Sequence, residues 1–133
     1  MVLVDTSVWI EVFRRGSAFA LESTVDFDDV VTCFPVIQEV LQGFDDERAF
    51  RVARASMLAL PVLEDPMTVG VYEHAAELYR RGRRSGLTVR SSVDCLIAAC
   101  ALRHDVEVLH RDRDYDAIAS VTPLRVRNIG RRR

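Results

Sequence analysis

The sequence predicts an α/β protein in which helices cover both faces of a parallel sheet. Short apolar segments rich in β-branched residues alternate with segments whose apolar residues recur at helical spacing, which is typical of βαβ units. Apolar residues make up 49% of the 133 residues and charged residues 29%, which is enough apolar material for a core and argues against disorder. The length suits one domain, which we place at residues 1–130, followed by a frayed basic tail at 131–133.

The chain opens with a strand that leads directly into a helix. Residues 2–4 form a short, unbroken apolar run of the kind found in strands buried on both faces. Residues 5–7 offer N-cap side chains for an apolar-periodic helix over residues 8–13, and Gly16 ends that helix.

The same order continues to the middle of the chain. We expect a short second helix over residues 18–25 and a second buried strand over residues 30–33. Pro35 opens the next helix at a position where its missing N–H is harmless, and Gly43 closes that helix. Residues 46–58 then form an amphipathic helix.

The second half contains a weak strand, two long helices and three short elements. The weak strand covers residues 61–63, and Pro66 opens a helix that runs to about Arg84. Ser91 caps the next helix, which covers residues 92–103. The remaining elements are a strand at 106–109, a short helix at 115–119 and a last strand at 124–126. Right-handed crossovers would bring the loops after the strands to one edge of the sheet, where such sheets bind ligands.

The composition argues against several kinds of catalytic chemistry and against a membrane or secreted protein. All 18 basic residues are arginine, so no lysine can serve as a P-loop residue, a Schiff base or a general base. Cys33, Cys95 and Cys100 form no Cys-x-x-Cys pair, and we expect buried thiols rather than a zinc site or disulfides. No apolar run approaches the ~18 residues of a membrane span. The N-terminus lacks the basic region of a signal peptide, so we expect a cytoplasmic protein with no membrane contact.

Five acidic residues occupy predicted strand ends or otherwise apolar helices. Burying one unpaired carboxylate is costly, and several close together cannot all ionise without a cation. Carboxylate oxygens suit a hard divalent cation, and such sites hold phosphate oxygens and water while phosphodiesters are cut. The five residues are Asp5, Glu39, Asp94, Asp112 and Asp114.

Each of these acids also has a structural explanation. Asp5 could cap the helix that follows it, and Glu39 could pair with an arginine. Asp94 stands three residues after a serine, as in a capping box. Asp114 could cap the short helix that follows it, and Asp116 is best explained as a favourable charge at the same helix end. The joint placement of the acids, rather than any one of them, indicates a metal site.

Three segments resemble the motifs of the PIN-domain nucleases. Residues 4–9 (VDTSVW) resemble the opening motif of that family. Residues 88–99 (TVRSSVDCLIAA) and 109–119 (LHRDRDYDAIA) resemble the later motifs of its VapC toxins. The resemblance covers essentially the whole chain, and no acidic position departs from the pattern.

The resemblance implies a PIN-like, three-layer α/β/α sandwich around a parallel sheet of four or five strands. It implies an endoribonuclease that depends on Mg²⁺ or Mn²⁺ and hydrolyses RNA with a metal-activated water, as the toxin of a type II toxin–antitoxin module. It also implies a homodimer and a VapB-type antitoxin, which we expect to place an arginine in the acidic site. Carried over by motif, the catalytic acids are Asp5, Glu39, Asp94 and Asp112. The metal ligands would be Asp5, Asp94, Asp112 and Asp114, with Thr6 and Ser7 as supporting hydrogen-bonding residues.

The two parts of the chain differ in charge. Residues 1–79 hold 5 arginines and 14 acidic residues, a net charge of −9, while residues 80–133 hold 13 arginines and 6 acidic residues, a net charge of +7. An acidic pocket repels a polyanion, so RNA binding requires a positive rim beside it. Alternatively, arginines at the end of the long helix only complement its dipole. The arginines expected to bind RNA are Arg81, Arg83, Arg84 and Arg90.

Three other functions fit the sequence less well than a nuclease does. A non-catalytic nucleic-acid-binding module with a PIN-like fold would have lost an acid, and none is missing. A phosphatase of the haloacid dehalogenase type needs Asp-x-Asp near its start and a lysine, whereas position 7 is serine and lysine is absent. A purely structural protein would not explain acids at strand ends and in apolar helices.

Overall fold

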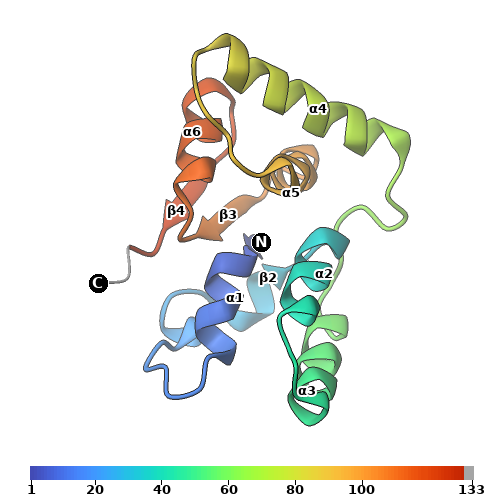
Figure 1. Ribbon diagram of the computed structural model, residues 1–133, viewed down its shortest axis with the longest axis vertical. Helices are drawn as coiled ribbons and strands as arrows, with labels where there is room; N and C mark the ends of the chain where they lie inside the picture. The colour runs from blue at the N-terminus through green and yellow to red at the C-terminus, as the bar shows by residue number, and fades with distance from the viewer. Residues whose placement is uncertain (131–133) are drawn as a thin grey trace.

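A parallel sheet with helices on both sides makes up residues 1–130 in the computed structural model of the chain (Figure 1). The frayed tail expected at 131–133 lies outside these described residues. Within them, strands run in the order β2–β1–β3–β4 and every neighbouring pair is parallel, as the sequence predicts. The strands are β1 (Val2–Val4), β2 (Val30–Val31), β3 (Glu107–His110) and β4 (Val126–Asn128).

Helices on the two sides of the sheet give the predicted α/β arrangement. α1 lies against one side of the strands, α5 and α6 lie against the other, and α4 packs on α5 and α6 (Figure 1). None of the helices within residues 1–130 has the length and apolar character needed to cross a membrane. The helices are α1 (Thr6–Phe13), α2 (Phe34–Gln42), α3 (Glu47–Leu58), α4 (Val69–Arg84), α5 (Ser92–Arg103) and α6 (Arg113–Val121).

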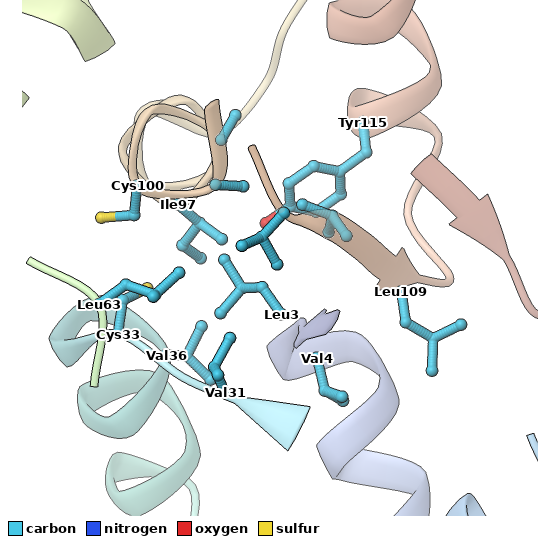
Figure 2. Close-up of a cluster of buried hydrophobic side chains, with 14 of the residues drawn as sticks. Leu3, Val4, Val31, Cys33, Val36, Leu63, Ile97, Cys100, Leu109 and Tyr115 are labelled. Atoms are coloured by element: carbon cyan, nitrogen blue, oxygen red, sulfur yellow. The ribbon is translucent and has the colours of Figure 1, made fainter. Parts of the chain in front are cut away.

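The main core lies between the sheet and α5. Figure 2 shows Leu3 of β1 beside Ile97 of α5 and the ring of Tyr115 on α6, whereas Val4 points toward α1. These four side chains are fully buried. Because successive residues of a strand point to opposite faces, β1 contributes to the packing on both sides of the sheet. The cysteines are buried free thiols, as expected.

The prediction of a short helix over residues 18–25 is wrong. Only a 3₁₀ turn forms there, at Leu21–Ser23. The Ser17 side chain accepts a backbone N–H and the Ser23 hydroxyl donates to a backbone carbonyl. Serine side chains that bond the nearby backbone in this way compete with helix formation.

The segment between α3 and α4 also differs from expectation. Thr68 has an extended backbone and precedes the first helical residue, so α4 begins at Val69 rather than at Pro66. The weak strand expected at residues 61–63 is a single parallel bridge between Val62 and Thr32. This bridge prolongs the edge of the sheet beside β2 without making a further strand.

The carboxyl ends of β1 and β3 lie side by side at the centre of the sheet. Val4 pairs with Leu109, and the N–H of Asp5 donates to the carbonyl of Leu109 at 2.9 Å. α1 follows β1 directly and α6 follows β3 almost at once, so their first residues converge. This edge of an open α/β sheet is where ligands usually bind.

Candidate metal centre

Three carboxylates meet at the carboxyl edge of the sheet. Asp94 lies in the first turn of α5, Asp112 is the N-cap of α6 and Asp114 lies in the first turn of α6. One oxygen atom from each of these side chains lies within 4.8 Å of the other two. Asp94 and Asp114 are buried whereas Asp112 is partly exposed, so the group is reachable from solvent past Asp112.

Asp94 lies in an environment that disfavours its charged form. Burial is the largest cause that raises its pKa from the ordinary 3.8 to about 9, and the charges of Asp5 and Asp112 add to the effect. Its Oδ2 atom is buried and has no hydrogen-bond partner within residues 1–130. A buried carboxylate oxygen without a partner is costly unless a cation binds it. Because the three donors are all carboxylate oxygens, the group fits Mg²⁺ or Mn²⁺ better than a soft metal.

The capping explanation of Asp94 accounts for its backbone but not for its side chain. Ser91 is the N-cap of α5, and its hydroxyl accepts the N–H of Asp94 at 3.4 Å. In a capping box the Asp94 carboxylate would accept the N–H of Ser91. That N–H instead donates to Asp114 at 3.3 Å, so the Asp94 carboxylate faces the acidic group.

Asp5 caps α1 and also lies beside the acidic group. Its Oδ2 accepts the backbone N–H of Ser7 at 3.0 Å and the Ser7 hydroxyl at 2.6 Å. Its Oδ1 accepts the hydroxyl of Tyr115 at 2.6 Å, and that hydroxyl also lies 3.5 Å from Asp94 Oδ1. Asp5 is therefore connected to Asp94 through Tyr115 and stands outside the group of three.

The part played by Tyr115 was missed by sequence reasoning. An aromatic residue in a short amphipathic helix usually serves the core, and Tyr115 does fill the core. The available signal was its hydroxyl, because a buried tyrosine hydroxyl needs a hydrogen-bond partner.

Glu39 approaches the acidic group from α2. Its Oε1 accepts the hydroxyl of Thr6 at 2.8 Å, and it forms no ion pair with an arginine of the described chain. Burial raises the pKa of the Glu39 carboxyl, and the hydrogen bond from Thr6 opposes that shift. The nearby negative charges of Asp5 and Asp112 raise this pKa further.

Backbone N–H groups of the loop before α5 hold the side chain of Asp114. Asp114 Oδ2 accepts the backbone N–H of Arg90 at 3.1 Å and that of Ser91 at 3.3 Å. Arg90 Nε lies 3.7 Å from Asp114 Oδ1. Asp112, not Asp114, caps α6, because Asp112 Oδ1 accepts the N–H of Asp114 at 2.9 Å.

Among the four arginines expected at the rim, Arg90 is the one that reaches the acidic group. Arg84 pairs with a glutamate of its own helix at 2.8 Å, and Arg83 stacks over a tyrosine one turn earlier, 5.1 Å from the ring centre. Arg81 reaches the carbonyl of Val121, the last residue of α6, whereas the acids lie at the other end of that helix. These three side chains are thus occupied elsewhere on the molecule.

A buried ion pair beside the site was not anticipated. Glu11 is only 6% exposed, and its Oε1 lies 2.7 Å from Arg111 Nη1. The backbone N–H of Arg111 donates at 2.9 Å to the Ser7 hydroxyl, which itself donates to Asp5. The pair therefore ties α1 to the segment between β3 and α6. The available signal was an acid within an apolar helix, the same signal that identified the site glutamate on α2.

The sheet order and the acids at its carboxyl edge define the class of protein. Residues 2–121 of the sequence match the family model of the PIN domain. The chain therefore belongs to the PIN-domain family.

Known proteins place the chain more narrowly, among the VapC proteins. It is 40% identical over 129 residues to Ribonuclease VapC11 of Mycobacterium tuberculosis, an alignment covering 93% of this chain and 96% of the relative. Its fold is similar to that of FitAcB from Neisseria gonorrhoeae, with a TM-score of 0.73, 22% identity and coverage of 96% and 97% of the two chains. DNA-bound VapBC from Salmonella typhimurium gives a TM-score of 0.77, 17% identity and 96% coverage of both chains.

Proposed function

We propose that the chain is a metal-dependent endoribonuclease, the toxin of a type II toxin–antitoxin module. The observation that carries the proposal is the group of three carboxylates, with an unpartnered Asp94 oxygen, at the edge of a PIN-domain sheet. The similarity to a VapC ribonuclease supports RNA as the substrate. A non-catalytic module would have no need to retain buried, mutually repelling acids.

The acids divide into ion-binding and proton-accepting roles. Asp94, Asp112 and Asp114 would hold Mg²⁺ or Mn²⁺, and Asp5 adds its negative charge from beside them. When bound, an ion of this kind would supply Lewis-acid chemistry to the scissile phosphate and to the attacking water. Glu39 stands outside the group of three and is oriented by Thr6, so we assign it the general-base role.

A comparison of three substrates tests this function. Purified protein would be incubated with RNA, DNA and a phosphomonoester in Mg²⁺, Mn²⁺ or EDTA. We expect RNA cleavage with either metal and none in EDTA. Metal binding should also stabilise the fold, by about 2.7 kcal/mol at 100-fold excess over the dissociation constant. RNA cleavage that persists in EDTA contradicts the proposal, and hydrolysis of the phosphomonoester supports the phosphatase alternative.

Tyr115→Phe should lower RNA cleavage by about 10- to 100-fold, as loss of a partner that orients a metal ligand does, because the hydroxyl lies 3.5 Å from Asp94 Oδ1. The substitution keeps the ring in the core and removes only the hydroxyl that bonds Asp5. The rate should be measured over a metal titration, with Tyr72→Phe as a control because Tyr72 is 53% exposed. Wild-type cleavage at every metal concentration would show that Tyr115 serves the core alone.

An apolar groove beside the acids supports the proposed antitoxin partner. The groove between α1 and α2 has a volume of about 250 Å³. Trp9, Ile10, Phe13 and Phe44 line it, and Glu39 lies in its wall. An antitoxin segment with apolar side chains in this groove would bring an arginine to the acidic group, where it can bridge carboxylates. The antitoxin we propose is a VapB-type protein that gains order on binding.

Ile10→Asp should weaken antitoxin binding, by about tenfold or more, without unfolding the protein. Ile10 is 57% exposed, so a carboxylate there stays hydrated in the free protein but is desolvated in the complex. Val52→Asp on α3 is the matched control, because Val52 is 60% exposed and lies outside the groove. Co-purification with the product of the neighbouring gene, followed by titration, measures the effect. Equal losses for the two variants would place the antitoxin elsewhere.

A second apolar surface supports the proposed homodimer. The groove between α4 and α5 has a volume of about 490 Å³, and its lining includes Tyr72, Ala75, Val93 and Leu96. Exposed apolar surface of this kind is typical of contacts between subunits. Sedimentation of the purified protein tests whether it is a dimer. RNA and antitoxin are both encountered in the cytoplasm, where we propose that the protein acts.

A further inference from the structure

A cavity adjoins the acidic group on the side of the loop between α4 and α5. It has a volume of about 310 Å³. This lies at the lower end of the range of roughly 300–1,000 Å³ for small-ligand sites. Asp114 lines this cavity and also belongs to the group of three carboxylates, so the two sites are directly adjacent. The cavity is lined by Leu87, Thr88, Arg90, Arg113, Asp114 and Ala117.

The two arginines of the cavity make it receptive to an anion. Arg90 partly neutralises Asp114, since its backbone N–H and its Nε both face that carboxylate. Arg113 is exposed and has no hydrogen bond or ion pair from its side chain to another residue within 1–130. Guanidinium groups bind phosphate oxygens in a bidentate manner, and both are within one small cavity here.

The position of Arg113 is not explained by the stability of its helix. Arg113 is the first residue of α6, where a positive charge opposes the helix dipole. The basic residues at the end of α4 are in the opposite situation, because a cation at a helix C-terminus is favourable. A positive charge kept at an unfavourable helix end, next to an acidic centre, points to a negatively charged ligand.

We propose that this cavity binds the phosphodiester group adjacent to the one that is cut, on a single RNA strand. Arg113 and Arg90 contact the phosphate oxygens, and Thr88 offers a hydroxyl donor. Leu87 and Ala117 provide apolar surface for the attached ribose or base. The inference rests on the proposed ribonuclease function and adds to it the residues that position the substrate.

Binding to a catalytically inactive protein tests the cavity without cleavage. The Asp94→Asn protein would be titrated with a short single-stranded RNA over a salt series. Adding Arg113→Ala should weaken binding about tenfold at low salt and reduce the salt slope by about 0.7, since one phosphate is no longer neutralised. Arg54→Ala is the control, because Arg54 is exposed on α3 and does not line the cavity. Equal behaviour of the Arg113 and Arg54 variants, with melting temperatures unchanged, overturns the proposal.

Cleavage kinetics place the bound phosphate relative to the cut. Once wild-type protein defines the cleaved linkage, a neutral methylphosphonate is introduced at each neighbouring linkage in turn. At one of them it should lower kcat/KM about as much as Arg113→Ala does, and the two changes together should add no further loss. Independent losses at every linkage overturn the cavity while leaving the ribonuclease intact. If the wild-type protein cuts no RNA, the proposed ribonuclease function is wrong. The binding measurements over the salt series then still test whether the cavity binds an RNA phosphate.

Discussion

Asp94→Asn is expected to lower metal-dependent RNA cleavage by well over 100-fold while the fold stays intact. Loss of a residue that merely orients a metal ligand costs about 10- to 100-fold, and Asp94 is proposed as a ligand itself. Asn keeps the volume of the side chain but provides one neutral oxygen in place of two charged ones. Cleavage rates and the rise of melting temperature with Mg²⁺ should both be measured. Wild-type cleavage by the variant would rule out a metal-binding role for Asp94.

The same substitution should change how stability depends on pH. The Asp94 carboxyl has the ordinary aspartate pKa of 3.8 in the unfolded chain, and its pKa is raised to about 9 in the metal-free folded protein. Between these values the folded state keeps a proton that the unfolded state has lost, so Asp94 makes the protein less stable as pH rises. Asp94→Asn cannot ionise and should therefore exceed the wild type in stability, increasingly so toward pH ~9.

Denaturation curves in EDTA at several pH values measure this difference. Asp45→Asn is the control, because Asp45 is exposed and removed from the acidic group. Mg²⁺ should reduce the advantage of the Asp94 variant, since the ion compensates the charge in the wild type alone. An advantage that shrinks as pH rises would contradict the raised pKa.

Glu11→Ala should destabilise the protein by about 3 kcal/mol, within the range for breaking a buried ion pair. Glu11 joins Arg111 at 2.7 Å and Arg14 at 2.9 Å, and the side chain of Arg111 is only 14% exposed. The loss should fall at the lower end of that range, because Arg111 still donates to the carbonyl of Gly130. Urea unfolding gives the change in stability.

A double-mutant cycle separates the pair from its surroundings. If Glu11 and Arg111 act together, Glu11→Ala combined with Arg111→Ala should cost clearly less than the sum of the single changes. Glu11→Gln should retain part of the stability, since it keeps the shape and one hydrogen-bond acceptor. Additive losses would show that the two residues contribute separately.

Local signals predicted those elements that are stabilised locally. α5 covers Ser92–Arg103 as expected, because Ser91 supplies a cap and an unbroken helix-forming segment follows. The helix expected at residues 18–25 failed, since two serines bond the backbone in a non-helical turn. The start of α4 was misplaced because Pro66 is compatible with a helix start but does not require one.

The acidic group was predictable in part from strand order. Adjacent parallel strands bring Asp5, after β1, beside Asp112 and Asp114, after β3. Asp94 comes from the first turn of α5 instead, and its place in an apolar helix was the signal for it. Contacts between side chains from separate elements were not predictable. A count of arginines cannot reveal that Arg84 is paired within its own helix, nor can spacing show that the Tyr115 hydroxyl reaches Asp5.

The pairing of β1 with β3 delays the appearance of the acidic centre during synthesis. Asp5 emerges from the ribosome long before its neighbours Asp112 and Asp114. A nascent chain that stops short of β3 can pair β1 with β2 but has no edge on which the acids could meet. A translating ribosome therefore completes β3 and the start of α6 before the acidic centre can form, and fragments that terminate before β3 lack that centre.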